Sequence, residues 1–418
     1  MKTYKGDTSV NALVLTEYGT AFFVSNANVP PIQFEYHVKI KIFNTEGLKK
    51  GTVEIPLYSR DKGSYDQLRS VKGITYNKGD KGQLERINLA NDQVQTTKID
   101  EHHSIVKFTL PKMSKGSVIE YSYIIETPYI NNFKTWMFQS DIPKLSSTYE
   151  ISIPKLYGYE VSLKGSLPLT TNTFKEVPRC FFLNGVNYEC VTGIYHMENI
   201  PAFVAQPNML SPKSFMSGVY FQLTDMAVIS NFVDRNMSSG RQAIARNWKE
   251  FSDFLKLQDN FGDQIKKKFP FKNELAKVAE QQTTPLDKAK AVFTYIQKNF
   301  TWNGYDGIFT DDGVKKSFEK RKGSVGDINI ALISALNSAG ISADPVLLST
   351  RDNGTVNKAA PSLNDLNYVV AKVIIGDKVY FADATDPNVV FGQLPSRALN
   401  GQGYIISLHS TDDWIDLH

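Results

Sequence analysis

Hydrophobic and polar residues alternate along many short segments of the first half of the chain. The clearest segment runs from Phe34 to Ile42, where every second residue is apolar and the residues between them are Glu, His or Lys. This period of two predicts a strand with one buried face. Shorter runs of the same kind lie at residues 106–110, 119–125 and 149–153. The pattern predicts an all-β region of one or more antiparallel sandwiches over residues 1–235.

Near residue 240 the apolar residues change to the spacing of a helix. Behind Thr284, a good N-cap, they form one long helical face. A second helix is predicted from about Val325 to Ala339, ended by Gly340. Strands follow it at residues 345–349, 368–375, 379–382 and 404–408. The order predicts an α+β domain over residues 236–418, with helices first and an antiparallel sheet after them.

Charge and cysteine content narrow the possible functions. The 418 residues include 47 Lys and Arg against 43 Asp and Glu, and this net charge of +4 is too small to indicate a nucleic acid partner. No apolar stretch reaches the ~18–20 residues of a membrane span, so no transmembrane segment is predicted in this chain. Two cysteines are too few for a disulfide-rich scaffold, a four-thiolate zinc site or an iron–sulfur cluster.

Other short motifs predict no site. His102-His103 lacks further ligands at metal spacing, so no metal and no other cofactor is expected. The basic runs Lys266-Lys267-Lys268 and Lys320-Arg321-Lys322 are interpreted as solvated surface rather than as a polyanion site.

Three motifs in the second half follow one another in an order that matches a known family. They are Gly323-Ser324-Val325-Gly326-Asp327, then residues 366–370, then residues 380–385. A helix start, a strand start and a strand end in this order resemble the transglutaminase-like branch of the papain-like thiol enzymes. In that family a Cys at the helix start is the nucleophile, a His opens the next strand, and an Asp orients the His. The resemblance implies a papain-like α+β domain, and it matches Val325, Tyr368 and Asp383 to these three positions.

The first half resembles the bacterial domain of unknown function DUF3857, which commonly precedes such a domain. The strand motifs that carry this resemblance lie at residues 39–44, 116–121 and 136–139. Together the two resemblances cover nearly the whole chain.

The catalytic positions depart from the family pattern, which predicts a degenerate triad. Val325 has no group that could form an acyl-enzyme, and Tyr368 is a poor base at neutral pH because tyrosine has a pKa of about 10. Ser324 is expected to cap its own helix, and Asp327 to stabilise the first helical turn. Asp383 is expected to accept hydrogen bonds in a structural role. The six histidines lie outside the motifs, at positions 37, 102, 103, 196, 409 and 418.

The two cysteines flank a predicted hairpin. Asn184-Gly185 is a typical two-residue turn, and one additional bulge residue would bring Cys180 opposite Cys190. A disulfide between them would indicate an oxidising compartment. Two unrelated buried thiols are the alternative.

These observations lead to two hypotheses of function. The first is a non-catalytic transglutaminase-like protein of the bacterial cell envelope, periplasmic or at the cell surface, with a leader peptide removed. It would bind a peptide, a glycan or an envelope protein, in a cleft that includes Trp302, Ser324 and Asp327. The alternative is a hydrolase or acyltransferase of peptidase or amidase type, with Ser324 as nucleophile or an acid pair of Asp327 and Asp383. A cytoplasmic location stays open as the second possibility.

Overall fold

The chain divides into two compact units. The computed structural model describes residues 3–25, 30–79, 81–206, 209, 211–227, 241–243, 245, 247–359, 361–408 and 411–417. One unit comprises Met1–Pro207 and Phe215–Gln242, and the other comprises Asn208–Ser214 and Ala243–His418. We call them the β unit and the α+β unit. The expected boundary at 235/236 lies outside the described residues, as do His409 and His418.

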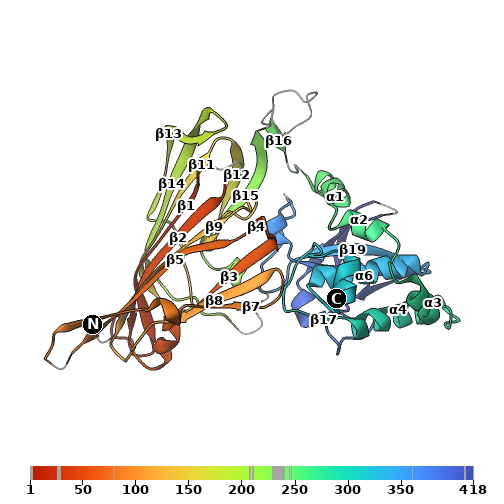
Figure 1. Cartoon of the computed structure of the whole chain (residues 1–418), viewed down its shortest axis with the longest axis horizontal. Coiled ribbons are helices and arrows are strands. Elements are labelled where there is room, and N and C mark those ends of the chain that lie inside the picture. The colour runs from red at the N-terminus through yellow and green to blue at the C-terminus, as the bar shows by residue number, and fades with distance from the viewer. Residues whose placement is uncertain are drawn as a thin grey trace. The chain divides into compact units, whose positions relative to one another are not determined.

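The described residues of the β unit form three sheets (Figure 1). The largest has eight strands in the order β13-β14-β11-β1-β2-β9-β5-β6, and two smaller sheets have the orders β10-β15-β12, with β16 beside β15, and β4-β3-β8-β7. The strands are β1 (Ala12–Phe23), β2 (Ile32–Ile42), β3 (Thr52–Asp61), β4 (Ser64–Tyr65), β5 (Gln67–Lys78), β6 (Leu84–Asn88), β7 (Gln95–Lys98), β8 (His103–Thr109), β9 (Val118–Thr127), β10 (Trp136–Met137), β11 (Lys144–Pro154), β12 (Tyr157–Lys164), β13 (Thr171–Leu183), β14 (Val186–Ile200), β15 (Gly218–Ala227) and β16 (Arg241–Ala243).

Each small sheet shares a hydrophobic core with a different half of the large sheet. The first core includes the stacked rings of Trp136 and Tyr149, whose centroids lie 4.9 Å apart. The second core includes Phe108 from β8 and Ile40 from β2. The β-rich prediction for this half is therefore confirmed, and the alternation of β2 reflects one face buried in these cores. The prediction of purely antiparallel pairing is wrong at one place, because β1 and β11 are parallel neighbours.

A buried ion pair joins these two parallel strands. Lys144 Nζ lies 2.6 Å from Glu17 Oε2, and both side chains are less than a tenth exposed. The Ser147 hydroxyl donates to the same carboxylate oxygen at 2.6 Å, and the Tyr36 hydroxyl donates to the other oxygen at 2.9 Å. The carboxylate therefore has a charge partner and additional donors, which is what a buried charge requires.

The α+β unit has helices before an antiparallel sheet, as the sequence predicts. Its sheet has the order β21-β20-β19-β22-β23, and a short parallel pair joins β17 to β18. Within the described residues no helix is long and apolar enough to cross a membrane. The elements are α1 (Trp248–Lys256), α2 (Gly262–Lys266), α3 (Lys272–Ala279), α4 (Pro285–Asn299), β17 (Thr301–Trp302), α5 (Val314–Lys320), β18 (Lys322–Gly323), α6 (Val325–Ser338), β19 (Ser342–Leu348), β20 (Tyr368–Ile375), β21 (Lys378–Ala382), β22 (Gln402–Ile405) and β23 (Asp413–Asp416).

Helix α6 is the centre of this unit. Every residue from Val325 to Leu336 is buried, because β19 and β20 contact the helix and so do α2, α4 and α5. A helix that is apolar on all sides is stable only in such a position. Gly326 permits a close approach, since a Cβ there would lie 1.9 Å from the carbonyl oxygen of Phe309. Gly340 adopts φ +79° just beyond the helix, as expected for a C-terminal cap.

Candidate functional site

The start of α6 holds the first group of predicted site residues. The Ser324 hydroxyl accepts a hydrogen bond from the Asp327 amide at 3.3 Å, and the Asp327 carboxylate accepts from the Ser324 amide at 3.1 Å. This reciprocal arrangement is a capping box. The Ser324 hydroxyl also donates to the carboxylate at 3.1 Å, and both residues are only 2% exposed. Ser324 is therefore occupied by its own helix and faces no solvent.

Asp327 also fastens neighbouring segments to the helix start. Its second carboxylate oxygen accepts hydrogen bonds from the Ser317 hydroxyl at 2.7 Å and from the Asp311 amide at 3.1 Å. Burial raises the pKa of Asp327, and the hydrogen bonds from Ser317 and Ser324 oppose that rise. All of its contacts are explained by local structure.

Val325, the residue that the sequence resemblance matches to the nucleophile, has an inert side chain. Val325 is fully buried in the hydrophobic core of the unit. Its backbone amide donates to the Tyr305 carbonyl at 3.1 Å, so this first amide of the helix is already satisfied. Neither the side chain nor this amide is available to a substrate.

Tyr368 and Asp383, which the sequence resemblance matches to the base and the acid, form a hydrogen-bonded pair. Tyr368 opens β20 and Asp383 follows β21, and the tyrosine hydroxyl donates to Asp383 Oδ2 at 2.6 Å. Both side chains are fully buried. Burial, together with the negative charge of Asp383, raises the pKa of Tyr368 far above its usual value. The phenol therefore stays protonated at neutral pH and cannot act as a general base.

The other oxygen of Asp383 is equally well satisfied. Asp383 Oδ1 accepts from Asn329 Nδ2 at 3.0 Å, from the Thr385 amide at 2.9 Å and from the Thr385 hydroxyl at 2.7 Å. With Tyr368, four donors surround one carboxylate. This is the geometry expected of a buried structural carboxylate.

Sequence reasoning missed Arg397, which completes this network. Its Nε donates to the Tyr368 hydroxyl at 2.9 Å, and its Nη2 donates to the Thr385 hydroxyl at 2.5 Å. The guanidinium also lies 4.3 Å from the ring centroid of Trp302, a cation–π contact. Arg397 lies in a short 3₁₀ turn, Ser396–Ala398, where no periodic pattern singles it out. The structure thus brings Trp302 together with Arg397, whereas Ser324 and Asp327 are enclosed.

Asp306 is a second group that the sequence did not indicate. It is exposed, and Asn367 Nδ2 donates to it at 3.1 Å. Nearby protein displaces water from the carboxyl group and raises its pKa to about 6, aided by the charges of Asp352 and Asp383 and opposed by Arg397. An exposed acid with a raised pKa beside an arginine is suited to binding a polar partner.

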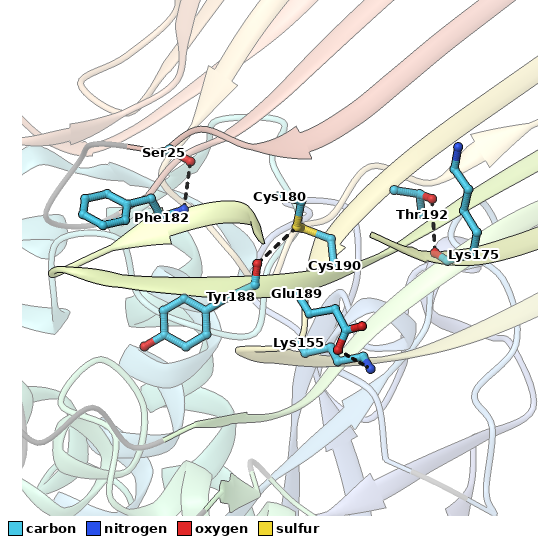
Figure 2. Close-up of a disulfide and its surroundings, with 9 residues drawn as sticks. All are labelled: Ser25, Lys155, Lys175, Cys180, Phe182, Tyr188, Glu189, Cys190 and Thr192. Atoms are coloured by element: carbon cyan, nitrogen blue, oxygen red, sulfur yellow. Dashed lines mark hydrogen bonds and ion pairs between the residues drawn. A yellow bond between two sulfur atoms is a disulfide. The ribbon is translucent and has the colours of Figure 1, made fainter. Parts of the chain in front are cut away.

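In the β unit, Cys180 and Cys190 are joined by a disulfide across the β13–β14 hairpin (Figure 2). Their Cα atoms lie 5.8 Å apart. The Asn184-Gly185 turn has positive φ at both residues, and a bulge in β13 shifts the register between Val177 and Phe181. The bulge gives Cys180 its position beside Cys190.

Comparison with solved structures supports the fold of the whole chain. A candidate protease from Parabacteroides distasonis is 13% identical, with a TM-score of 0.64 over 98% of this chain and 72% of that one. A candidate cysteine protease from Cytophaga hutchinsonii is 10% identical, with a TM-score of 0.23 over 94% and 88% of the two chains. An M1 zinc metallopeptidase from Deinococcus radiodurans is 11% identical, with a TM-score of 0.20 over 44% and 42%. Only the first alignment has a TM-score high enough to support a shared fold. At 13% identity it supports the fold and says nothing about function.

Family models match one segment in each half of the chain. Residues 32–178 match a domain of unknown function with a solved structure, DUF3857. Residues 273–384 match the transglutaminase-like superfamily. None of the curated proteins matches the chain. The chain therefore carries a DUF3857 domain followed by a transglutaminase-like domain.

Proposed function

We propose that the transglutaminase-like domain is non-catalytic and binds a peptide, a glycan or a protein partner. The observation that carries this proposal is the burial of Val325 and Tyr368 at the nucleophile and base positions. Acyl transfer needs a nucleophile with a lone pair and a base that can take its proton. Val325 lacks the first, and the raised pKa of Tyr368 removes the second.

The alternative of a serine hydrolase is disfavoured by the geometry of Ser324. Its hydroxyl lies in the capping box of α6, and the carboxylate that it contacts belongs to the same box. A nucleophile must reach an acyl carbon from an open surface, and Ser324 is 2% exposed. The acid pair of Asp327 and Asp383 is disfavoured for the same reason, since both carboxylates are buried and fully hydrogen-bonded.

The surface around Arg397 supports a binding role. The guanidinium, the half-buried ring of Trp302 and the exposed carboxyl of Asp306 offer a cation, an aromatic surface and an acid within one neighbourhood. Such a combination of charged and aromatic groups is typical of polar recognition sites.

A location in the bacterial cell envelope, in the periplasm or at the cell surface, is part of this proposal. It is supported by the disulfide between Cys180 and Cys190, because such bonds persist in oxidising compartments. Mass spectrometry of the secreted protein under non-reducing conditions is expected to find no free thiol. Two free thiols would contradict the location.

Activity measurements test the absence of catalysis. The unaltered chain and Ser324→Ala are incubated with peptide, amide and acyl-donor substrates, and hydrolysis and amine incorporation are measured. No turnover is expected from either protein. Turnover that disappears in Ser324→Ala would refute the proposal and establish the hydrolase.

Peptide and glycan arrays, together with capture of envelope proteins, test the binding role. Asp306→Asn alters the proposed surface, and Asp377→Asn, in the exposed turn after β20, is the matched control. Binding is expected to weaken in the first variant and to be unchanged in the second. Equal binding by all three proteins would remove the Arg397 surface from the proposal, and absence of any binding would overturn the proposed class of partner.

A further inference from the structure

A lysine-lined cavity lies in the transglutaminase-like domain, far from the degenerate triad. It has a volume of about 560 Å³ and is bordered by α2, α3, α4 and the last turns of α6. The 14-residue helix α6 rises about 20 Å, so the cavity and Val325 lie at its opposite ends. The lining side chains with a positive charge are Lys266, Lys267, Lys268, Lys272 and Lys288. We call this the lysine cavity.

The positive charges of the lysine cavity are largely uncompensated. Lys266 Nζ donates to the Lys256 carbonyl at 2.7 Å. The other four lysines form no ion pair with any described residue, and Glu280 is the one acidic residue among those that line the cavity. The C-terminal ends of α2, α3 and α6 border the cavity as well, and each adds at most about half a negative charge. Clustered cations in one concave site raise its positive potential and attract anions.

The loop between α2 and α3, which includes Lys267 and Lys268, is held in place by hydrogen bonds to α6. The Ser334 hydroxyl donates to the Lys267 carbonyl at 3.1 Å, and the Phe269 amide donates to the Ser338 hydroxyl at 2.8 Å. Both serines belong to α6, so the loop between α2 and α3 is fastened to the most buried helix of the domain. The backbone of this loop is therefore ordered before a ligand binds, and the conformational entropy lost on binding comes mainly from the lysine side chains.

The chemistry of the lining selects the class of anion. Lysine ammonium groups are compact point charges that bind phosphate oxygens, and several of them in one site suit an anion with several negative charges. The volume lies within the range of small-molecule sites. We propose that the lysine cavity binds a molecule or headgroup that bears two or more phosphate groups. The three lysines of the run are exposed, as the sequence interpretation expects, and α3 and α4 bring Lys272 and Lys288 to the same cavity.

Two double variants of the full chain test the proposal. Lys272→Gln/Lys288→Gln removes two cavity charges from α3 and α4. Lys277→Gln/Lys290→Gln removes two charges from the same helices at positions that do not line the cavity. Calorimetric titration with tripolyphosphate at about 150 mM salt, where distant surface charges are screened, measures the affinity of each protein.

The unaltered protein is expected to bind tripolyphosphate, and the cavity variant to bind it at least about tenfold more weakly. The control variant is expected to bind within about twofold of the unaltered protein. Absence of binding, or equal weakening in both variants, overturns the proposal. Citrate bound as tightly as tripolyphosphate overturns the assignment to phosphate. Co-sedimentation with vesicles of phosphatidylcholine and cardiolipin tests whether the phosphate groups belong to a lipid headgroup or to a free compound. Sedimentation of the unaltered protein that is lost in the cavity variant supports a lipid headgroup. Binding of tripolyphosphate without sedimentation supports a free phosphate compound.

Discussion

Removing the hydroxyl of Tyr368 tests whether the triad positions form a structural network. Tyr368→Phe keeps the ring that is buried in the core and deletes only the oxygen between Asp383 and Arg397. The buried carboxylate of Asp383 then keeps three of its four donors. The Nε of Arg397 loses its acceptor, but this half-buried side chain is able to contact water.

The size of the effect follows from these contacts. A hydrogen bond to a charged group contributes about 1.5–3 kcal/mol, and the lost donor lies 2.6 Å from the carboxylate. We therefore expect Tyr368→Phe to lower the free energy of unfolding by about 2 kcal/mol. For a domain of this size that loss corresponds to a Tm lower by roughly 4–8 °C.

Scanning calorimetry of the full chain measures this change. Tyr380→Phe is the matched control, since Tyr380 lies on the neighbouring strand β21 and its hydroxyl makes no described hydrogen bond. Its stability is expected to change by less than about 0.5 kcal/mol. Asp383→Asn is expected to cost more than Tyr368→Phe, because an amide would place hydrogens against surrounding donors.

A further measurement separates a network from independent contacts. In a network, the double variant Tyr368→Phe/Asp383→Asn loses less stability than the sum of the two single variants. Unaltered stability of Tyr368→Phe, or an equal loss in Tyr380→Phe, would refute the structural role of the hydroxyl.

Three other changes have expected outcomes. Lys144→Met leaves Glu17 buried without a charge partner, so urea unfolding should show a loss of about 3–5 kcal/mol, part of which Glu17→Gln recovers in the double variant. Gly326→Ala places a Cβ 1.9 Å from the Phe309 carbonyl oxygen, so calorimetry should show a loss of about 3 kcal/mol. The Asp306 carboxyl should titrate near pH 6 when it is followed by NMR. The folded state holds its proton more tightly than the unfolded state, so the protonated carboxyl adds to stability. This contribution is fully present below the usual pKa of 3.8 and should disappear as the pH rises through about 6. Asp306→Asn should therefore gain stability relative to the unaltered protein between pH 4 and pH 7.

Local features of the second half were predictable from the sequence because their causes are local. The cap of α6 depends on Ser324 and Asp327, three residues apart, and its end depends on Gly340. The antiparallel sheet after this helix follows from period and turn residues alone. The order of the motifs was enough to indicate the transglutaminase-like superfamily.

The contacts of Arg397 and of the lysine cavity were not predictable, because they join segments without a shared pattern. Arg397 meets Tyr368 across 29 positions of sequence, from a turn with no periodicity. The lysine run at 266–268 is joined by Lys272 and Lys288 only after α3 and α4 have packed. In the β unit, the turn of the cysteine hairpin is visible in Asn184-Gly185, but the position of its bulge depends on the whole sheet.

The hydrogen bonds of Asp383 account for its burial. A carboxylate that is fully buried is tolerated only when donors surround it and a positive charge lies nearby. Tyr368, Thr385 and Asn329 supply the donors, and Arg397 supplies the charge through the first two. In a thiol enzyme of the same fold, a histidine would fill the place of Tyr368, and its imidazolium would balance the carboxylate. Here the phenol of Tyr368 is neutral and cannot balance the charge of Asp383. The guanidinium of Arg397 supplies the positive charge instead. The contacts of Asp383 are therefore accounted for by hydrogen bonding and charge balance within the domain.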